Sequence, residues 1–592
     1  MSGGDSLDLA VALLASGDHP QAAQACRDAL ADPSLEAPLR AEASSLLGLA
    51  LLPSDPEAAL PPLREAVALD PAEPMFRFNL GQGLEKAEDW QGAYEQFGEA
   101  IARGGGEPQV VFAHARAASR LGKHRETAQA LAPLVAMDTV PRPVARLQAT
   151  TLRTLGDNYE ALVAAQHLIP GAGATFDEQV SEDLHFVLSL SLAVFEYNMA
   201  EAIARNLIAA DPADARAALA LATVRHWRGD ARGARTALES ALDDDNAPAP
   251  VLASYLVRHD DAKARLLAEA RRQAEDEDVP DGDRSALHLA LAQYRSREGD
   301  AGAAIAHALK GHALGVPDEH YGVAALREVF EANVRFAREN DELSPSGETP
   351  RLLYIVGMPR SGGSLVQSVL AAGPGCSSVG ERAALLPYLV DDPDALSALS
   401  AEERAARFAQ LRDADLRGMA RQAGEAKLVV DKAPHAMFAA GGIAAIHPGA
   451  RFLCPLRDPQ AIALSIWLRR FPARFGYAHA IGTILDAVEL QLEALERWQS
   501  LGLDMRVLDF EAFARDPEVE ARGLFEWLGL DFEPACLEPE SRSQPVPTYS
   551  AAQVRQPIRP APMPEGYSEL FAGHAATLTR LRERQEALLA KG

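Results

Sequence analysis

The sequence has few cysteines, and their positions exclude two classes of small stabilised protein. The four cysteines, Cys26, Cys376, Cys454 and Cys536, lie far apart and form no CxxC pair. This pattern argues against both a zinc cage and a disulfide framework. Scattered thiols are typical of the reducing cytosol, so the sequence predicts a cytoplasmic protein.

Basic residues are also in short supply. The chain has 57 Lys and Arg against 84 Asp and Glu, which gives a formal net charge of −27. A general nucleic-acid binder should be basic, and an anionic membrane surface attracts basic chains. We therefore expect neither as a partner, and a polyanionic acceptor would need a locally basic cleft.

Long apolar runs are missing as well. The sequence has no uninterrupted stretch of about 20 apolar residues, which a membrane span requires. The opening Met-Ser-Gly-Gly-Asp has no basic region or apolar run of a signal peptide. At 592 residues with 48% apolar composition, the chain is expected to form two to four domains with sizeable cores.

The first half of the chain repeats. Small residues suited to packing one helix against its pair recur at Ala22, Ala59, Ala93, Ala128, Ala161, Ala200, Ala234 and Ala304. Several copies carry a Gly-Asp turn just before that Ala, as at Gly17-Asp18 and Gly229-Asp230. The pattern resembles the tetratricopeptide repeat of about 34 residues, whose stacked helix pairs form a concave surface. The alternative is a helical domain with accidental periodicity.

After a polar stretch at residues 340–350 the pattern changes. Short apolar runs separated by helical segments follow at Leu352–Val356, Leu428–Asp431, Arg451–Leu456 and Met505–Asp509. Strands that alternate with helices indicate an α/β domain with a parallel sheet. We therefore predict an α-solenoid of tetratricopeptide repeats over residues 5–340, a linker over 341–350 and a three-layer α/β domain of P-loop type over 351–592.

Residues 354–365 indicate a strand, a glycine-rich turn and a helix, an arrangement that binds phosphate. Three residues occupy Walker A positions: Gly357, Gly362 and Ser364. The Lys that reaches the β/γ-phosphates of ATP is missing, because Gly363 stands in its place. Arg360 precedes the turn instead. The loop favours a nucleotide without a γ-phosphate, and a phosphotransferase is the alternative.

A second anion site is predicted at the end of another strand. Arg457 ends the strand, and Ser465 and Arg469 follow on one face of the next helix, four residues apart. Two guanidinium groups and a hydroxyl match the oxygens of a phosphate group. The alternative for Arg469 is a solvated helix face. Two phosphate sites together favour a bis-phosphorylated nucleotide.

On these motifs, residues 350–560 resemble the sulfotransferases that use 3′-phosphoadenosine 5′-phosphosulfate (PAPS), and among them the tyrosylprotein sulfotransferase-like branch. The resemblance implies that Arg457, Ser465 and Arg469 bind the 3′-phosphate of this co-substrate. It also implies that the 5′-phosphosulfate is held by the loop residues Arg360, Ser361, Gly362, Gly363, Ser364 and Leu365.

Further matches to this family supply candidate catalytic residues. The resemblance implies that Glu381, in Gly-Glu-Arg, is the base that takes the acceptor proton. Arg360, Lys432 and Ser550 would stabilise charge on the leaving phosphate, and Arg555 would make a late nucleotide contact. No metal is implied.

A rival base and two departures from the family pattern keep alternatives open. His435 lies three residues after Lys432, and soluble small-molecule sulfotransferases use a His base. Gly363 replaces a hydroxyl residue of the family loop, and Phe510 stands where relatives carry Tyr. These two changes motivate a second hypothesis, an inactive repeat scaffold that binds nucleotide.

The function predicted from the sequence is transfer of a sulfuryl group from PAPS to an acceptor hydroxyl. By resemblance the acceptor is a protein tyrosine, and a glycan or small-molecule hydroxyl is the alternative. Concave repeat surfaces commonly recruit peptides or proteins, so we expect such a partner for the helical half. A homodimer is left open by the sequence.

Overall fold

A computed structural model describes residues 3–171, 175–242, 247–315, 322–339, 351–382, 384–390, 393–472, 475–538, 545–546, 551–560 and 562–590. The chain forms two compact units, Met1–Leu190 and Ser191–Gly592, and each is described by itself. Among the described residues, no helix is both long enough and apolar enough to cross a membrane.

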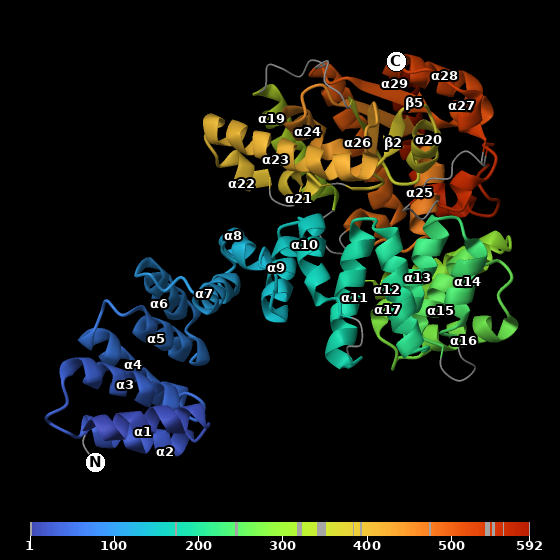
Figure 1. Cartoon of the computed structure of the whole chain (residues 1–592). Coiled ribbons are helices and arrows are strands. Elements are labelled where there is room, and N and C mark those ends of the chain that lie inside the picture. The colour runs from blue at the N-terminus through green and yellow to red at the C-terminus, as the bar shows by residue number, and fades with distance from the viewer. Residues whose placement is uncertain are drawn as a thin grey trace. The chain divides into compact units, whose positions relative to one another are not determined.

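The first unit is built from paired helices, each packed on the next (Figure 1). They are α1 (Gly3–Ala15), α2 (His19–Leu30), α3 (Ala37–Leu51), α4 (Pro56–Leu69), α5 (Pro74–Lys86), α6 (Trp90–Ala102), α7 (Pro108–Arg120), α8 (His124–Val135), α9 (Arg142–Thr154) and α10 (Asn158–Ala165), with α11 (Glu178–Ala193) at the division between the units. This is the predicted helical repeat.

The Gly-Asp turns explain where the paired helices end and begin. Gly17 and Gly156 have φ angles of +81° and +82°, a conformation that glycine adopts without steric cost. The carboxylate of the following residue, Asp18 or Asp157, then accepts a hydrogen bond from the third backbone N–H beyond it, which caps the second helix.

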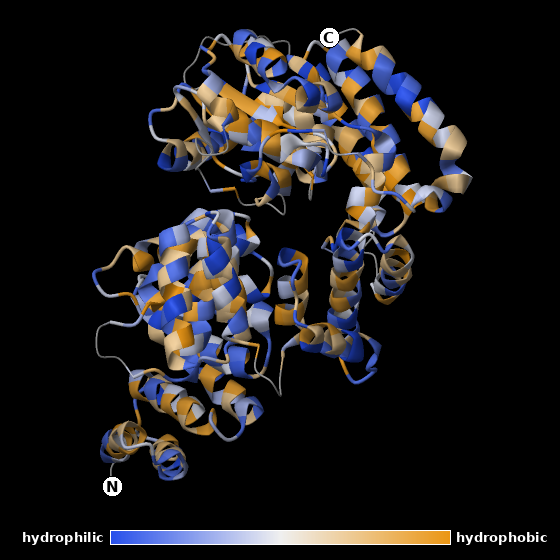
Figure 2. Ribbon diagram, turned by 90° about the vertical axis from the view of Figure 1, so that its right-hand side faces the viewer, coloured by the Kyte–Doolittle hydropathy of each residue, from blue (hydrophilic) through white to orange (hydrophobic). Residues whose placement is uncertain are grey.

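The recurring alanines lie where helices meet. Residues at most 1% exposed include Ala22, Ala59, Ala93, Ala161, Ala200, Ala234 and Ala304. A side chain larger than methyl at these positions would push the paired helices apart. Hydrophobic and hydrophilic residues alternate along the helices (Figure 2), as expected where one face of each helix is buried.

The repeat continues into the second unit. Its helices are α12 (Tyr197–Ala210), α13 (Ala215–Trp227), α14 (Ala231–Glu239), α15 (Ala249–Arg258), α16 (Ala264–Glu275), α17 (Asp281–Arg297), α18 (Ala301–Leu314) and α19 (Val323–Arg338). The helices α13, α15 and α17 pack side by side (Figure 1). Together they form an inner row of this part of the unit.

The rest of the second unit is organised around a parallel sheet. Its strands are β1 (Arg351–Ile355), β2 (Cys376–Ser378), β3 (Leu428–Lys432), β4 (Arg451–Leu456) and β5 (Met505–Asp509). The strand order is β2-β3-β1-β4-β5, and every pairing is parallel. The predicted α/β class and the four predicted strands are confirmed, and β2 is an addition.

Helices cover both faces of the sheet. They are α20 (Gly363–Ala371), α21 (Leu386–Leu389), α22 (Pro393–Ser397), α23 (Ala401–Ala423), α24 (Ala440–Ile446), α25 (Pro459–Trp467), α26 (Ile481–Ser500), α27 (Phe510–Arg515), α28 (Pro517–Leu528) and α29 (Ala575–Leu589). Alternate residues of β1 enter different cores. Leu353 and Ile355 pack with α20 and α28, whereas Leu352 and Tyr354 pack with α19, α24, α26 and α29. The fold therefore has the predicted three layers.

One core joins the last repeat helices to the sheet. Val329 and Phe330 of α19 and Leu289 of α17 belong to the same buried cluster as Tyr354 and Phe452 of the sheet. The predicted linker, residues 341–350, lies outside the described residues. The predicted boundaries of the domains stay a prediction.

Candidate active site

The glycine-rich loop connects β1 to α20, and hydrogen bonds from its backbone N–H groups hold it in place. Gly357 N donates to Pro434 O at 3.0 Å, and Met358 N donates to the Oε1 atom of Gln491. Gln491 is completely buried in α26. A buried acceptor of this kind fixes the position of the loop. The loop lies at the carboxyl ends of the strands, where parallel sheets bind their ligands.

Three residues of the loop have positive φ angles, and the first is Gly357 at +118°. Gly362 has a φ of +101°, and a Cβ at this position would collide with the ring of Phe510. Arg360 has a φ of +72° although it is not glycine, which costs about 1–2 kcal/mol. Helix α20 begins at once after Gly362, so its first N–H groups lie at the loop.

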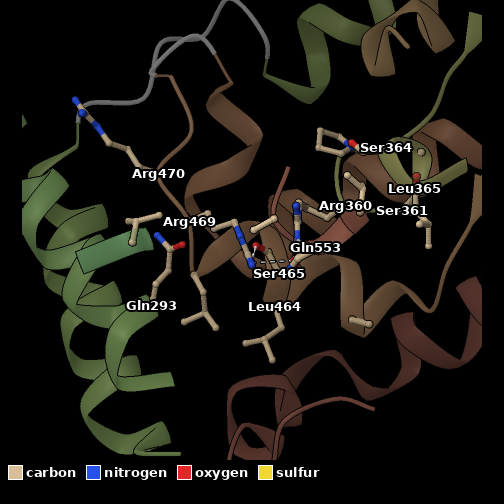
Figure 3. Close-up of a pocket in the computed structure, with 18 of the residues that line it drawn as sticks. Gln293, Arg360, Ser361, Ser364, Leu365, Leu464, Ser465, Arg469, Arg470 and Gln553 are labelled. Atoms are coloured by element: carbon tan, nitrogen blue, oxygen red, sulfur yellow. Dashed lines mark hydrogen bonds between the residues drawn. The ribbon is translucent and has the colours of Figure 1, made fainter. Parts of the chain in front are cut away.

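Three arginines and one serine meet beside this loop: Arg360 of the loop joins Arg457, Ser465 and Arg469, the residues of the second predicted anion site. Arg360 Nε donates to Ser465 Oγ at 3.0 Å, and Arg469 Nη1 donates to the same oxygen at 2.9 Å. Arg457 Nη1 donates to the carbonyl oxygen of Arg360 at 3.1 Å. Arg360 Nη2 also donates to Gln553 Oε1 at 3.0 Å. Figure 3 shows Arg360, Ser465 and Gln553 together.

The electrostatics of this cluster favour an anion. Burial, with the positive charges of Arg469 and Arg457, lowers the pKa of Arg360 well below its ordinary value. Burial and the charge of Arg457 lower the pKa of Arg469 to about 10, and burial also lowers that of Arg457. A bound phosphate would reduce the repulsion between guanidinium groups that lie close together in a desolvated site.

The register of the sheet brings Glu381 to Lys432. Ser378 pairs with Val430, and two residues farther on Lys432 N donates to Gly380 O at 2.9 Å. Lys432 Nζ then forms an ion pair with Glu381 Oε1. The Lys432 side chain is 8% exposed and that of Glu381 is 37% exposed, so the carboxylate is the accessible member of the pair.

A buried network holds the turn that carries Glu381. Arg382 N donates to Asp431 Oδ1 at 3.2 Å, and the Arg382 guanidinium forms an ion pair with Asp415 of α23. His447 Nε2 lies 2.9 Å from the other oxygen of Asp415. Burial alone would raise the pKa of Asp415, but the His447 hydrogen bond and the Arg382 charge outweigh it and lower that pKa.

The loop, the arginine cluster and the Glu381–Lys432 pair line one cavity of about 1110 Å³. This volume exceeds the usual 300–1,000 Å³ of a site for a single drug-sized ligand. The wall opposite the loop comes from the inner row of repeat helices. Ala286, Ala290, Gln293 and Arg297 share one face of α17 and line it, and Figure 3 shows Gln293 pointing toward Arg469.

Two predicted residues, Arg555 and His435, are placed differently from the rest. Arg555 donates to Trp227 O at 2.7 Å and to Ala551 O at 2.8 Å, so its guanidinium faces the repeat turn. His435 is buried, stacks on Phe475 and has its Nε2 2.9 Å from the Tyr477 hydroxyl. Neither side chain is part of the cavity lining within the described ranges. Ser550 lies outside the described residues.

Sequence reasoning missed the glutamines of the site. The amide of Gln491 accepts a hydrogen bond from the loop, and that of Gln553 accepts one from Arg360. The third, Gln293, lines the cavity wall formed by the repeat helices. A single amide in a helix or a short turn carries no spacing pattern, so no signal in one sequence would have found them. Their positions follow only from the packing of distant segments.

Comparison with known proteins agrees with this architecture. Residues 351–534 match the model of the sulfotransferase family. A protein of Aquifex aeolicus (strain VF5), named only as an uncharacterized protein, is 28% identical over 225 residues, which make up 35% of this chain and 29% of that protein. The match thus spans less than a third of that relative's length.

Among solved structures, pilF of Pseudomonas aeruginosa is similar at 19% identity and a TM-score of 0.30, over 36% of this chain and 94% of that one. Sulfotransferase STF1 of Mycobacterium tuberculosis H37Rv is similar at 13% identity and a TM-score of 0.25, over 53% of this chain and 99% of that one. The segment that matches the sulfotransferase family, residues 351–534, contains the parallel sheet and follows the predicted helical repeat.

Proposed function

We propose that this protein transfers the sulfuryl group of PAPS to an acceptor hydroxyl and releases adenosine 3′,5′-bisphosphate. The observation that carries the proposal is the meeting of Arg360, Arg457 and Arg469 beside a glycine-rich loop without a Walker Lys. A bis-phosphorylated nucleotide supplies an anion for each part of this cluster. The family match at residues 351–534 supports the same reaction.

Two groups of residues in the cavity would bind the two ends of PAPS, the sulfuryl donor. The backbone N–H groups at the start of α20, with Ser361 and Ser364, would hold the 5′-phosphosulfate. Arg457, Ser465 and Arg469 would hold the 3′-phosphate, and Arg360 lies between the two because its Nε atom already reaches Ser465. The donor brings a sulfuryl group whose bond to the phosphate oxygen is weak.

The Glu381–Lys432 pair supports the transfer step. As the acceptor oxygen bonds to sulfur and the bond to the phosphate oxygen breaks, Glu381 would take the acceptor proton. Lys432 and Arg360 would stabilise the negative charge that gathers on the leaving phosphate. The contact between Lys432 and Glu381 supports these two roles, because a proton acceptor and a charge stabiliser would then lie side by side. Ser550 is proposed to assist.

The repeat wall suggests the route of the acceptor. The face of α17 that includes Ala286, Ala290 and Gln293 lines the same cavity as Glu381, and its small residues leave room for a second molecule. We therefore assign the acceptor to the space between this wall and the loop. A tyrosine in a polypeptide is the proposed acceptor, recruited by the repeats, and a glycan or small-molecule hydroxyl is the second candidate.

Calorimetric titration with adenosine 3′,5′-bisphosphate tests the donor site, with ADP and ATP-Mg as control ligands. We expect selective binding of the bisphosphate, and Arg457→Ala should weaken it. Loss of one charge-assisted phosphate contact costs about 1.5–3 kcal/mol, a rise in Kd of roughly 10- to 150-fold. Arg522→Ala, at an arginine of α28 paired with Glu518, is the matched control.

Each outcome of this titration has a distinct meaning. No bisphosphate binding to the folded protein overturns the proposed function, and preference for ATP-Mg favours a phosphotransferase. Bisphosphate binding without transfer to any of a broad panel of phenols, sugars and tyrosine peptides favours the inactive scaffold. Gly363 and Phe510 motivate that scaffold. At Gly363 the family hydroxyl is missing, and a Cβ there would lie 3.5 Å from Lys432 Cδ.

A further inference from the structure

The turn between α13 and α14 is tied to the C-terminal part of the chain. The carbonyl oxygen of Trp227, at the end of α13, accepts hydrogen bonds from Arg555 Nη2 at 2.7 Å and from Val546 N at 3.0 Å. Arg555 Nη1 donates to Ala551 O within its own segment at 2.8 Å. One guanidinium group thus joins the repeat turn to residues 551–556.

The turn is shaped to receive Arg555. Gly229 has a φ of +84°, and a Cβ built on it would lie 2.7 Å from Arg555 Nε. Gly299, in the equivalent turn between α17 and α18, has a φ of +83° with nothing within 4 Å of such a Cβ. Gly229 therefore serves two needs, the left-handed turn and the space for Arg555, whereas Gly299 serves the turn alone.

The same segment contacts the glycine-rich loop on its other side. Gln553, two residues before Arg555, accepts the hydrogen bond from Arg360 Nη2 at 3.0 Å. Val554 is buried in an apolar cluster against which both Trp227 of the repeat and Leu365 of α20 pack. Figure 3 shows Gln553 beside Arg360. A continuous set of contacts therefore runs from the repeat turn to the loop.

We infer that Arg555 is a positioning residue of the donor site: by holding residues 551–556 on the Trp227 carbonyl, it keeps Gln553 against Arg360. Arg360 has a strained backbone and a long side chain, and such a group stays in one place only where its surroundings fix it. The repeat turn thereby sets the orientation of Arg360. The inference rests on the proposed function for the identity of the donor-site ligand.

Full-length variants test this role: Arg555→Ala, Arg555→Lys, Gly229→Ala and the control Gly299→Ala. Binding of adenosine 3′,5′-bisphosphate is measured by calorimetry, hydrogen exchange is followed over residues 357–365, and thermal melting reports stability. Both glycine variants have the same backbone cost, but only Gly229→Ala displaces Arg555.

We expect Arg555→Ala and Gly229→Ala to raise the bisphosphate Kd about tenfold and to speed exchange at residues 357–365. Gly299→Ala should lower the melting temperature as Gly229→Ala does, with neither of the other effects. Arg555→Lys should recover part of the affinity, because an ammonium group still reaches one carbonyl.

Two results would overturn the inference. One is an unchanged Kd together with unchanged exchange over residues 357–365 in Arg555→Ala. The other is equal effects of Gly229→Ala and Gly299→Ala on exchange and affinity, which would reduce Arg555 to a general stabilising contact. If the wild-type protein binds no bisphosphate, the proposed function fails, and the exchange measurement alone then decides whether Arg555 positions the loop.

Discussion

At the scale of single residues, the site depends on groups that act in pairs. Glu381 contacts Lys432, and Arg360 contacts Ser465. Under the proposed function, both members of each pair act on the sulfuryl donor or on the acceptor. A substitution therefore affects both partners, and separate measurements of binding and transfer are needed to tell their roles apart.

We expect Glu381→Gln to lower the rate of sulfuryl transfer by about 10²–10⁴-fold, the usual contribution of a general base. Bisphosphate affinity should change little, because Glu381 lies beside Lys432 rather than among the three arginines. Transfer is measured with labelled PAPS on an acceptor found in the panel, and affinity by calorimetry.

Glu425→Gln, at an exposed glutamate of the same domain, is the control for the loss of one carboxylate. If Glu381→Gln transfers the sulfuryl group as fast as the control variant does, another group accepts the proton.

The sequence was most informative where residue types and spacing act together. Ser465 lies in α25, and Arg469, predicted on the same helix, follows two residues after its end and still donates to the Ser465 hydroxyl. Arg457 joins them because it directly follows β4. Arg555 shows the limit of such reasoning. Its place in a motif suggested a nucleotide contact, but the contact with Trp227 depends on a segment more than 300 residues away, which no local pattern encodes.

At the scale of elements, the turn with Glu381 is held by three segments distant in sequence. Asp415 of α23 contacts both Arg382 and His447, and its carboxylate is only 3% exposed. The strand leading into this turn, β2, was not predicted, since Cys376–Ser378 is short and polar. Backbone pairing with β3 makes it a strand despite a weak local preference.

We expect Asp415→Asn to lower the free energy of unfolding at pH 7 by about 3–5 kcal/mol, because it leaves Arg382 without its buried partner charge. The pKa of Asp415 is lowered in the folded protein, so its stabilisation is full above the unfolded pKa of about 4. It is lost as the pH falls through the folded value. The wild-type and variant stabilities should therefore converge in acid.

Urea unfolding at about pH 7 and about pH 3, followed by the fluorescence of buried Trp498, measures both quantities. Asp413→Asn, at an exposed position of the same helix, should show neither effect. A stability difference that stays constant between the two pH values would contradict the assigned charge pairing.

At the scale of the whole molecule, the repeats and the sheet share a core. Val329, Phe330 and Phe336 of α19 pack in the cluster that covers one face of the sheet. The order of fold classes along the chain was readable from the change in periodicity near residue 340. The shared core was not, because apolar stripes show that a helix face is buried without showing what buries it.

We expect a fragment of residues 351–592 to be unfolded or insoluble, whereas a fragment of residues 191–592 should fold. The shorter fragment lacks the aromatic residues of α19, and each large core side chain contributes about 3–5 kcal/mol, against a total stability of about 5–15 kcal/mol. Near-ultraviolet circular dichroism and thermal melting compare the two. Cooperative melting of the shorter fragment would show that the sheet has a sufficient core of its own.

The shared core also makes the two ends of the helical array unequal. Repeat units contact mainly their neighbours. We therefore expect the first half of the array to tolerate the duplication or deletion of a whole unit. The final helices have no such freedom, because a change in α19 alters the core that covers one face of the sheet. Engineers who wish to exchange the first repeats should therefore cut near residue 190, and leave α12 to α19 with the sheet.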